Sequence, residues 1–146
     1  MFDLSRYQDD VTIRHVLDSA KTIAVVGLST NELRASHFVG FYLSRHGYRV
    51  IPVNPREREV LGQTSYRSLS DVPRPVDIVN VFRAPDALPA IAEEAVAIGA
   101  KALWCQFTVI SEEGARIAED NGLSVIMDRC IKVEHARYRG RMHWLG

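Results

Sequence analysis

The chain has 146 residues, which is the size of one domain with a hydrophobic core of its own. Lysine plus arginine balance aspartate plus glutamate at 18 each, so no global basic field exists to attract nucleic acid or an anionic membrane. Two cysteines are too few for a disulfide scaffold, and no stretch of about 18 apolar residues is present to span a membrane. The first residues lack the apolar run of a signal peptide. We therefore expect one cytoplasmic domain over residues 1–146 that has neither nucleic acid nor a membrane as its partner.

The first part of the chain predicts a helix, a strand and a second helix. A short helix is expected at about residues 11–20. Residues 22–26 are apolar and β-branched and end at a glycine, which predicts a strand. Apolar residues then recur at helical spacing between residues 38 and 43, and Gly47 is suited to end that helix.

The middle of the chain predicts two strands separated by a long polar segment. The strands are expected at residues 48–53 and 77–82. Residues 56–75 are polar and bounded by prolines, so we expect them to be irregular. At most, a short turn of helix is expected around residues 68–72.

The last part of the chain continues the alternation of strands and helices. A helix is predicted from Pro85, which suits a first turn, to a stop at Gly99. A strand over residues 102–105 follows. Ser111 is a suitable N-cap for the next helix, which is expected to stop near residues 121–122. The fifth strand is predicted over residues 123–127.

Five strands alternating with helices predict an α/β fold. Apolar residues at successive positions indicate strands that are buried on both faces, as in parallel sheets. We therefore expect a single domain with a Rossmann-like, doubly wound, parallel five-stranded sheet. Ligands of such sheets bind beyond the carboxyl ends of the strands, where the strand order reverses. The residues directly after each strand are thus the candidates for a site.

The segment after the first strand is a glycine turn that leads into a helix. The N–H groups of such a turn and of a helix N-terminus suit a pyrophosphate. Hydroxyl, amide and guanidinium donors follow the glycine, so the candidate phosphate-binding residues are Gly27, Ser29, Thr30, Asn31, Arg34 and Ser36. The alternative is an ordinary strand-to-helix loop in which Ser36 is the N-cap.

The dinucleotide fingerprint is incomplete in this segment. Only the first glycine of G-x-G-x-x-G is present, because Ser29 and Glu32 occupy the other two positions. The acidic residue that binds an NAD ribose after the second strand is also missing. Arginines there favour a nucleotide with an additional ribose phosphate, which coenzyme A (CoA) and NADP both carry; solvated surface arginines are the alternative. The candidate residues of this loop are Asn54, Pro55, Arg56 and Arg58.

The third and fourth strands end in residues that suit the rest of such a ligand. Val81 and Phe82 form an apolar wall beside Arg83, which fits an adenine or a neighbouring phosphate, although Phe82 also fits the core. Trp104 and Gln106 are candidates for lining a channel for a pantetheine arm. Trp104 fits the core equally well.

Cysteine chemistry is a further possibility after the fifth strand. Cys130 lies between Arg129 and Lys132, and a thiol beside cations near a helix start can exchange with another thiol. An inert buried cysteine is the alternative, and Cys105 is the other candidate thiol. The five histidines show no metal-ligand spacing, and no nucleophile, base and orienting residue are recognisable together. The sequence therefore predicts neither catalytic residues nor a metal site.

Together, these segments resemble the small stand-alone CoA-binding proteins, whose domain is similar to the CoA-binding N-terminal domain of the succinyl-CoA synthetase α subunit. The resemblance covers about residues 11–137 and is carried by residues 24–29, Arg34 with Ser36, 53–55, 59–62, 81–85, Trp104 with Gln106, and 127–130 followed by Lys132, Glu134 and His135. It implies that Gly27, Ser29 and the following loop hold the CoA pyrophosphate, with residues 54–58 and 81–83 around the adenosine.

The chain departs from this family at two places. The loop between Ser29 and Arg34 lacks a proline that family members often carry. A glycine that often follows the position of Gln106 is replaced by Phe107 and Thr108, which affects the expected shape of the pantetheine end. Ligase activity does not carry over from the synthetase, because its second domain has no counterpart in this chain.

Four functional hypotheses follow. The leading one is a protein that binds CoA or acyl-CoA and is not an enzyme. The others are an NADP-binding oxidoreductase-type domain, a thiol or redox protein that uses Cys130 with bound CoA, and an interaction domain whose ligand pocket has been lost. The sequence leaves open the acyl group, the pathway, any protein partner, and whether the chain is a monomer or a homodimer.

Overall fold

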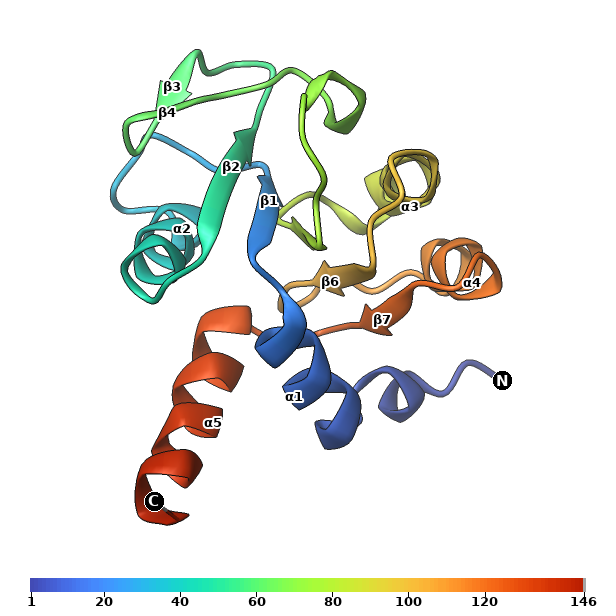
Figure 1. Cartoon of the computed structure of the whole chain (residues 1–146). Coiled ribbons are helices and arrows are strands. Elements are labelled where there is room, and N and C mark those ends of the chain that lie inside the picture. Colours follow the sequence, from blue (N-terminus) through green and yellow to red (C-terminus); the bar gives the residue numbers. More distant parts are fainter. Residues whose placement is uncertain (146) are drawn as a thin grey trace.

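Five parallel strands form a central sheet in the order β2-β1-β5-β6-β7 in the computed structural model (Figure 1). The structure describes residues 1–145, with side chains placed for residues 1–139; His143 and Gly146 thus lie outside the described side chains. Each neighbouring pair of strands in this sheet is parallel. The strands are β1 (Thr22–Val26), β2 (Arg49–Val53), β5 (Ile78–Val81), β6 (Ala102–Cys105) and β7 (Ser124–Ile126).

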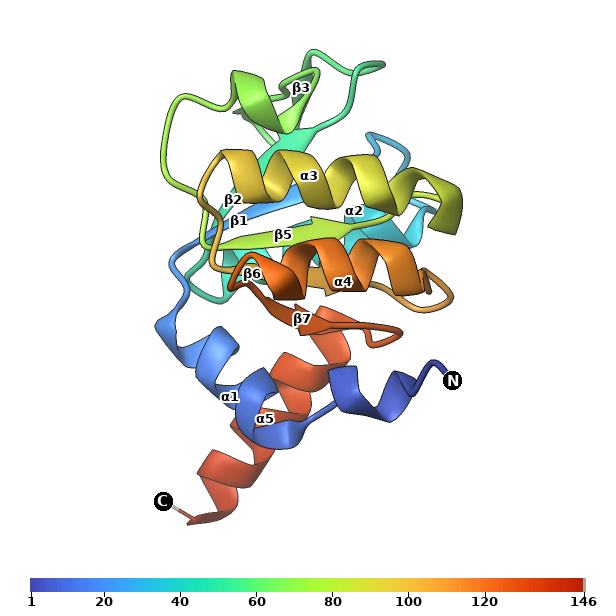
Figure 2. The same ribbon diagram turned by 90° about the vertical axis from the view of Figure 1, so that its right-hand side faces the viewer.

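Helices cover both faces of the sheet, with α3 and α4 on one face and α1, α2 and α5 on the other (Figures 1 and 2). None of the helices in residues 1–145 combines the length and the apolar content that crossing a bilayer requires. The α-helices are α1 (Asp10–Ser19), α2 (Ala35–Arg45), α3 (Leu88–Ala97), α4 (Glu112–Asp120) and α5 (Ile131–Leu145), and the 3-10 turns are η1 (Leu4–Tyr7), η2 (Leu69–Asp71) and η3 (Pro85–Ala87).

The core consists of two apolar layers, one on each face of the sheet. In β1, Ile23 and Val25 pack in the layer of α1, α2 and α5, whereas Ala24 and Val26 pack in the layer of α3 and α4. All four side chains are buried. Full burial of a side chain such as Ile or Val stabilises a fold by about 1.5–3 kcal/mol, so a run that is apolar at every position gains from both layers.

The structure confirms the predicted doubly wound α/β fold and its five parallel strands. β1 and β6 have the predicted bounds, and the other three strands lie one residue inside the predicted bounds at one or both ends. Ser111 is the N-cap of α4, as predicted, and its hydroxyl accepts a hydrogen bond from the N–H of Gly114. The predicted turn of helix in the polar segment is η2.

Besides the 3-10 turn η1, three elements were not predicted. The segment 56–75 contains a small antiparallel pair, β3 (Glu59–Val60) and β4 (Gln63–Thr64), which is too short to leave a periodic signal. Helix α5 also escapes prediction, because its charged and apolar residues do not segregate onto opposite faces at helical spacing. Its position is set by packing of Ile131 into the core.

The topology places the switch point between β1 and β5. The chain leaves β1 toward β2 on one side and returns to β5 on the other side of β1. Val26 pairs with both Val53 and Val81, so the residues that follow these three strands start at the same edge of the sheet. This is the edge at which doubly wound folds bind ligands.

Candidate ligand-binding site

A polar pocket of about 610 Å³ opens at the switch point. It lies beyond β1, β2 and β5, against the start of α2. Hydroxyl, guanidinium and backbone groups dominate its walls. We call it the polar pocket; its residues are Gly27, Ser29, Arg34, Ala35, Ser36, Asn54, Pro55, Arg56, Glu57, Phe82 and Arg83.

The turn after β1 requires glycine at its first position. Gly27 has a φ of 92°, and its N–H donates to the carbonyl oxygen of Val53 at 2.8 Å. A Cβ at this position would lie 2.6 Å from the carbonyl oxygen of Phe82. The turn therefore brings the ends of β1, β2 and β5 closer together than any side chain permits.

Ser36 closes this loop rather than capping the helix, so the N-cap interpretation of Ser36 is wrong. Its hydroxyl accepts a hydrogen bond from the N–H of Ser29 at 3.1 Å. The side chain of Ser29 in turn accepts from the N–H of Asn31 at 3.0 Å. These bonds fix the loop over the first turn of α2.

The N-terminus of α2 has no cap of its own. The N-cap residue is Arg34, whose guanidinium carries only donors and makes no capping hydrogen bond. Among the described residues, the N–H groups of Ala35 and Ser36 have no hydrogen-bond partner. The first turn of α2 contains no acidic residue. Free N–H groups, the positive end of the helix dipole and a cationic cap together suit an anion.

The walls of the polar pocket carry more positive than negative charge. Arg34, Arg56 and Arg83 are exposed side chains, and Glu57 is the acidic residue among the lining residues. Glu57 accepts a hydrogen bond from the hydroxyl of Thr30 at 3.2 Å. The pocket is thus cationic as well as rich in hydrogen-bond donors.

Asn54 holds two walls of the polar pocket together. Its Nδ2 donates to the carbonyl oxygen of Leu28 at 3.0 Å, and its Oδ1 accepts from the N–H of Arg56 at 3.0 Å. Asn54 therefore occupies the position at which a dinucleotide-binding fold carries a carboxylate. Its side chain joins the two loops by hydrogen bonds and provides no negative charge for a ribose.

A second, apolar pocket of about 520 Å³ adjoins the polar one. Both are lined by Ala35, Phe82 and Arg83. The second pocket extends between α2 and α5 and over the loop after β6. We call it the apolar pocket; its residues are Ala35, Phe38, Val39, Phe82, Arg83, Gln106, Phe107, Thr108, Val109, Cys130, Lys132 and Val133.

The loop at the mouth of the apolar pocket is strained. Thr108 has a φ of 69°, which is rare for a β-branched residue. Its N–H donates to the Asp128 carboxylate at 2.7 Å, and Asp128 also has a positive φ, of 57°. Strain of this kind gathers at functional sites, where the surrounding structure holds it in place.

The structure brings most of the predicted site residues together, and five of them lie elsewhere. Trp104 is fully buried in the core, and its indole N–H donates to the carbonyl oxygen of Arg129, so it lines neither pocket. Val81 is buried in the layer of α3 and α4. Thr30 and Asn31 shape the loop, and Arg58 is exposed outside the lining. The predicted residues that line a pocket are Gly27, Ser29, Arg34, Ser36, Asn54, Pro55, Arg56, Phe82, Arg83 and Gln106.

The prediction missed the helical walls of the apolar pocket. Phe38 is exposed on α2 and Val133 on α5, although both are apolar. The aromatic residues of α2 could have indicated this pocket from the sequence. An exposed phenylalanine is unusual on a helix that begins at the edge of the sheet where ligands bind. No sequence signal pointed to Val133, because α5 itself was not predicted.

The two cysteines occupy opposite sides of the sheet. Cys105 is fully buried in the layer of α3 and α4, and burial raises the pKa of its thiol far above the usual range. Cys130 packs in the other layer and lines the apolar pocket. Among the described residues, no group of histidine, cysteine and acidic side chains is arranged to hold a metal ion.

Another groove, of about 450 Å³, lies between α3 and α4. Its walls include the acidic residues Glu93, Glu113 and Asp120, with Arg116 as the cationic one. It is away from the carboxyl edge of β1 and β5, and its charge disfavours an anionic ligand. The polar and apolar pockets therefore form the candidate site.

Comparison with known proteins identifies relatives of two lengths. The chain is 44% identical over 124 residues to the uncharacterized protein YneT of Bacillus subtilis (strain 168), covering 85% of this chain and 92% of YneT. A solved structure of a hypothetical protein from Pyrococcus horikoshii OT3 superposes with a TM-score of 0.86 at 38% identity, covering 88% of this chain and 91% of that one. Acetate–CoA ligase (ADP-forming) I of Archaeoglobus fulgidus is 25% identical over 121 residues, which is 76% of this chain but 18% of the ligase.

A model of the family described as the CoA binding domain matches residues 21–136. That range begins just before β1 and extends into α5, so it includes both pockets. The chain belongs to the CoA-binding domain family.

Proposed function

We propose that this protein binds coenzyme A or an acyl-CoA across its two adjoining pockets. The observation that carries the proposal is the shared wall of Ala35, Phe82 and Arg83, which joins a cationic pocket to an apolar one. CoA has the same division, with a phosphorylated nucleotide at one end and a thiol-bearing arm at the other. The match to the family model supports this choice of ligand.

The nucleotide end belongs in the polar pocket. The pyrophosphate lies at the N-terminus of α2, where the N–H groups of Ala35 and Ser36 are free and Arg34 adds a guanidinium. Arg56 and Arg83 provide charge for the 3′-phosphate of the ribose. An NAD ribose has no carboxylate partner here, because Asn54 occupies that place and is bonded to Leu28 and Arg56.

The pantetheine arm belongs in the apolar pocket. Phe82 lies between the two pockets, so an arm that leaves the pyrophosphate passes over its ring. Phe38, Phe107 and Val133 then provide apolar surface for the methylene groups. An acyl group on the sulfur extends toward the same walls.

Titration calorimetry tests the ligand directly. Purified protein is titrated with CoA, dephospho-CoA, NADP and NAD under one buffer condition. We expect CoA to bind most tightly and dephospho-CoA more weakly, because dephospho-CoA lacks the 3′-phosphate. Binding of NAD as tight as that of CoA, or tighter, would contradict the proposal, and tightest binding of NADP would favour an oxidoreductase-type domain instead.

We further propose that the protein holds its ligand in the cytoplasm without turning it over. The support is chemical: the residues lining the two pockets do not include a nucleophile hydrogen-bonded to a general base. Incubation with acetyl-CoA and a thiol-detecting reagent checks this. We expect no steady release of free CoA; steady release that a single substitution in the pockets abolishes would overturn it.

A further inference from the structure

Cys130 stands at the start of α5, on the wall of the apolar pocket. Its carbonyl oxygen accepts the N–H of Glu134 at 3.0 Å, which is the first hydrogen bond of that helix. Reactive cysteines are commonly found at helix N-termini. The residue is 8% exposed, and it lines the apolar pocket.

The residue before Cys130 is held by both of its backbone polar groups. The indole N–H of Trp104 donates to the carbonyl oxygen of Arg129 at 2.9 Å. The N–H of Arg129 donates to the carbonyl oxygen of Cys105 at 3.3 Å. Trp104 thus has a positioning role beneath the pocket, and Cys130 is held at a defined place in its wall.

Gln106 supplies a hydrogen-bond donor on the same wall of the apolar pocket. It is 95% buried, and its Oε1 accepts hydrogen bonds from Asn80 Nδ2 and from the N–H of Ile131, both at 3.0 Å. Both donors hold the oxygen, so the Nε2 end faces the pocket that Gln106 lines, and it has no partner among the described residues. The Nε2 group is not enclosed by protein, so a ligand that fills the apolar pocket can accept a hydrogen bond from it. The pantetheine arm carries two amide carbonyl groups that can do so.

We propose that Cys130 is a thiol–disulfide exchange site for CoA bound in the two pockets. This inference rests on the proposed function, because the polar pocket must hold the nucleotide for the arm to reach Cys130. The oxidised co-substrate of the exchange is the disulfide of CoA. Cys105 takes no part, since it is fully buried on the opposite face of the sheet.

The exchange is balanced without any other oxidant. The thiol of Cys130 loses its proton to solvent, and its sulfur attacks one sulfur of CoA disulfide. The bond between the two CoA sulfurs breaks as the bond between Cys130 and one CoA forms. The second CoA leaves as a thiolate with the electron pair and takes a proton from water. A free thiol reverses the reaction by attacking the mixed disulfide, so the adduct forms under oxidising conditions and is lost under reducing ones.

Intact-mass spectrometry tests the site. The full chain is incubated with CoA disulfide, as are the variants Cys130→Ser and Cys105→Ala, and tryptic peptides of the unsubstituted protein locate the adduct. We expect the unsubstituted chain and Cys105→Ala to gain one CoA in disulfide linkage, removable by dithiothreitol, and Cys130→Ser to gain none. The peptide map keeps the test valid even if one variant does not fold.

Glutathione disulfide provides the matched control, because it lacks the nucleotide. We expect CoA disulfide to react about tenfold faster or more, since binding raises the local concentration of the reacting sulfur. Gln106→Glu keeps an acceptor for Ile131 and removes the amide donor, so adduct formation from CoA disulfide should slow by roughly three- to tenfold more than alkylation by iodoacetamide does.

The outcomes separate this inference from the proposed function. CoA that binds in calorimetry but gives no adduct, or an adduct on Cys105, overturns the inference and leaves the proposed function standing. Equal rates with both disulfides overturn the inference as well, because they show an accessible thiol without a binding site. CoA that fails to bind overturns the proposed function itself.

Discussion

Two helices begin at the same edge of the sheet, and their N-termini are built in opposite ways. Helix α4 has Ser111 as its N-cap, whose hydroxyl accepts the N–H of Gly114, and Glu112 and Glu113 lie in its first turn. Helix α2 has Arg34 at the N-cap, no capping bond and no acidic residue in its first turn. The sequence of α4 satisfies the positive end of its own helix dipole, whereas that of α2 leaves it open.

The difference between the two helix N-termini distinguishes the candidate site from the other groove better than pocket volume does. The groove beside α4 is of comparable volume but is lined by three acidic residues. The pocket beside α2 is lined by three arginines and one acidic residue. The uncapped N-terminus of α2 is the less stable of the two in the free protein. It is also the one that suits a ligand, because a bound anion supplies the missing cap.

The largest effect is expected from a methyl group at the first turn. Gly27→Ala places a Cβ 2.6 Å from the carbonyl oxygen of Phe82 at a positive φ, so we expect a loss of about 2–5 kcal/mol in the free energy of unfolding and loss of CoA binding. Gly122→Ala is the control, since Gly122 also has a positive φ, at the end of α4, but has open space around it. Its loss should be about 1–2 kcal/mol, without an effect on CoA affinity. Urea unfolding and calorimetry measure both; equal losses would contradict the close approach at Gly27.

The next effect concerns the arginine at the open helix end. Arg34→Ala removes a charge-assisted contact to the pyrophosphate, so we expect CoA affinity to fall by roughly 10- to 100-fold, equivalent to about 1.5–3 kcal/mol. Arg116→Ala on α4 is the matched control, because Arg116 is an exposed arginine paired with Glu112 at 2.8 Å. It should leave the dissociation constant unchanged. An unchanged value for Arg34→Ala in a folded protein would remove Arg34 from the site.

Smaller effects, of opposite sign on the free energy of unfolding, are expected from substitutions at the N-caps of α4 and α2. Ser111→Ala removes the cap of α4 and should lower the free energy of unfolding by about 1 kcal/mol with no change in CoA binding. Arg34→Ser gives α2 an ordinary cap and should raise the stability of the free protein by up to about 1 kcal/mol while weakening CoA binding. Thermal unfolding with and without CoA measures both terms. A stabilised Arg34→Ser protein that binds CoA normally would show that the open helix end is unrelated to the ligand.

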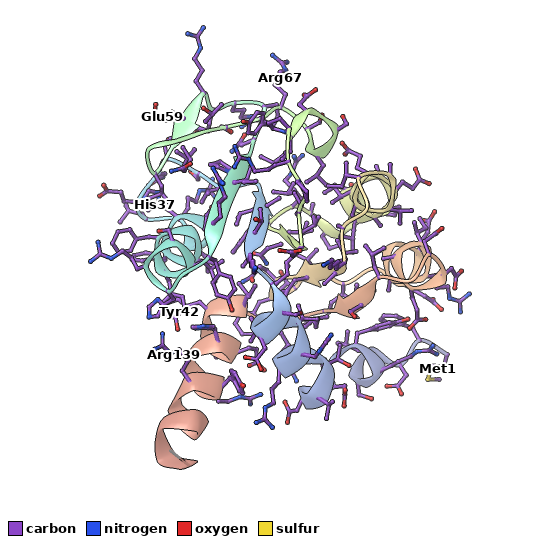
Figure 3. All side chains as sticks on the ribbon, in the orientation of Figure 1. Met1, His37, Tyr42, Glu59, Arg67 and Arg139 are labelled. Atoms are coloured by element: carbon purple, nitrogen blue, oxygen red, sulfur yellow. The ribbon has the colours of Figure 1, made fainter. Side chains whose placement is uncertain are left out.

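The smallest expected effect is a pH dependence of the free energy of unfolding, which arises from His135 where α5 packs against α2. A hydrogen bond of 2.8 Å joins the Tyr42 hydroxyl on α2 to His135 Nδ1 on α5, and Figure 3 shows Tyr42 where α2 faces α5. Burial, then the nearby His46, then Arg139 lower the pKa of His135 below its ordinary value. The unfolded chain therefore takes up a proton more readily, so this contribution to stability is present above about pH 6.5 and is lost as the pH falls.

Urea unfolding at pH 7.5 and 5.5 measures this loss, which we expect to be at most about 1 kcal/mol. His135→Gln should remove that part of the slope. His15→Gln, at an exposed site on α1, should retain it. A slope that is unaffected by His135→Gln would assign the pH dependence to other groups.

The sequence predicted what depends on local pattern and missed what depends on packing. Gly27 and Arg34, which line the polar pocket, could be predicted as candidates because a glycine after a buried strand, followed by a helix, is a local signal. Trp104 and Val81 were assigned to the site because strand ends are easy to find, whereas the face on which a side chain lies depends on the register of the whole sheet. Val133 was missed because the apolar pocket is formed by α2 and α5 together, and no local pattern specifies how two helices approach.

The most direct test of the account is a ¹H–¹⁵N NMR titration of the protein with CoA, with backbone amides assigned. The account predicts the largest shifts at the N–H groups of Ala35 and Ser36, which have no partner among the described residues in the free protein. It predicts no comparable shift at Gly114, whose N–H already donates to Ser111. Shifts that concentrate at the start of α4, or that spare Ala35 and Ser36 while CoA is bound, would contradict it.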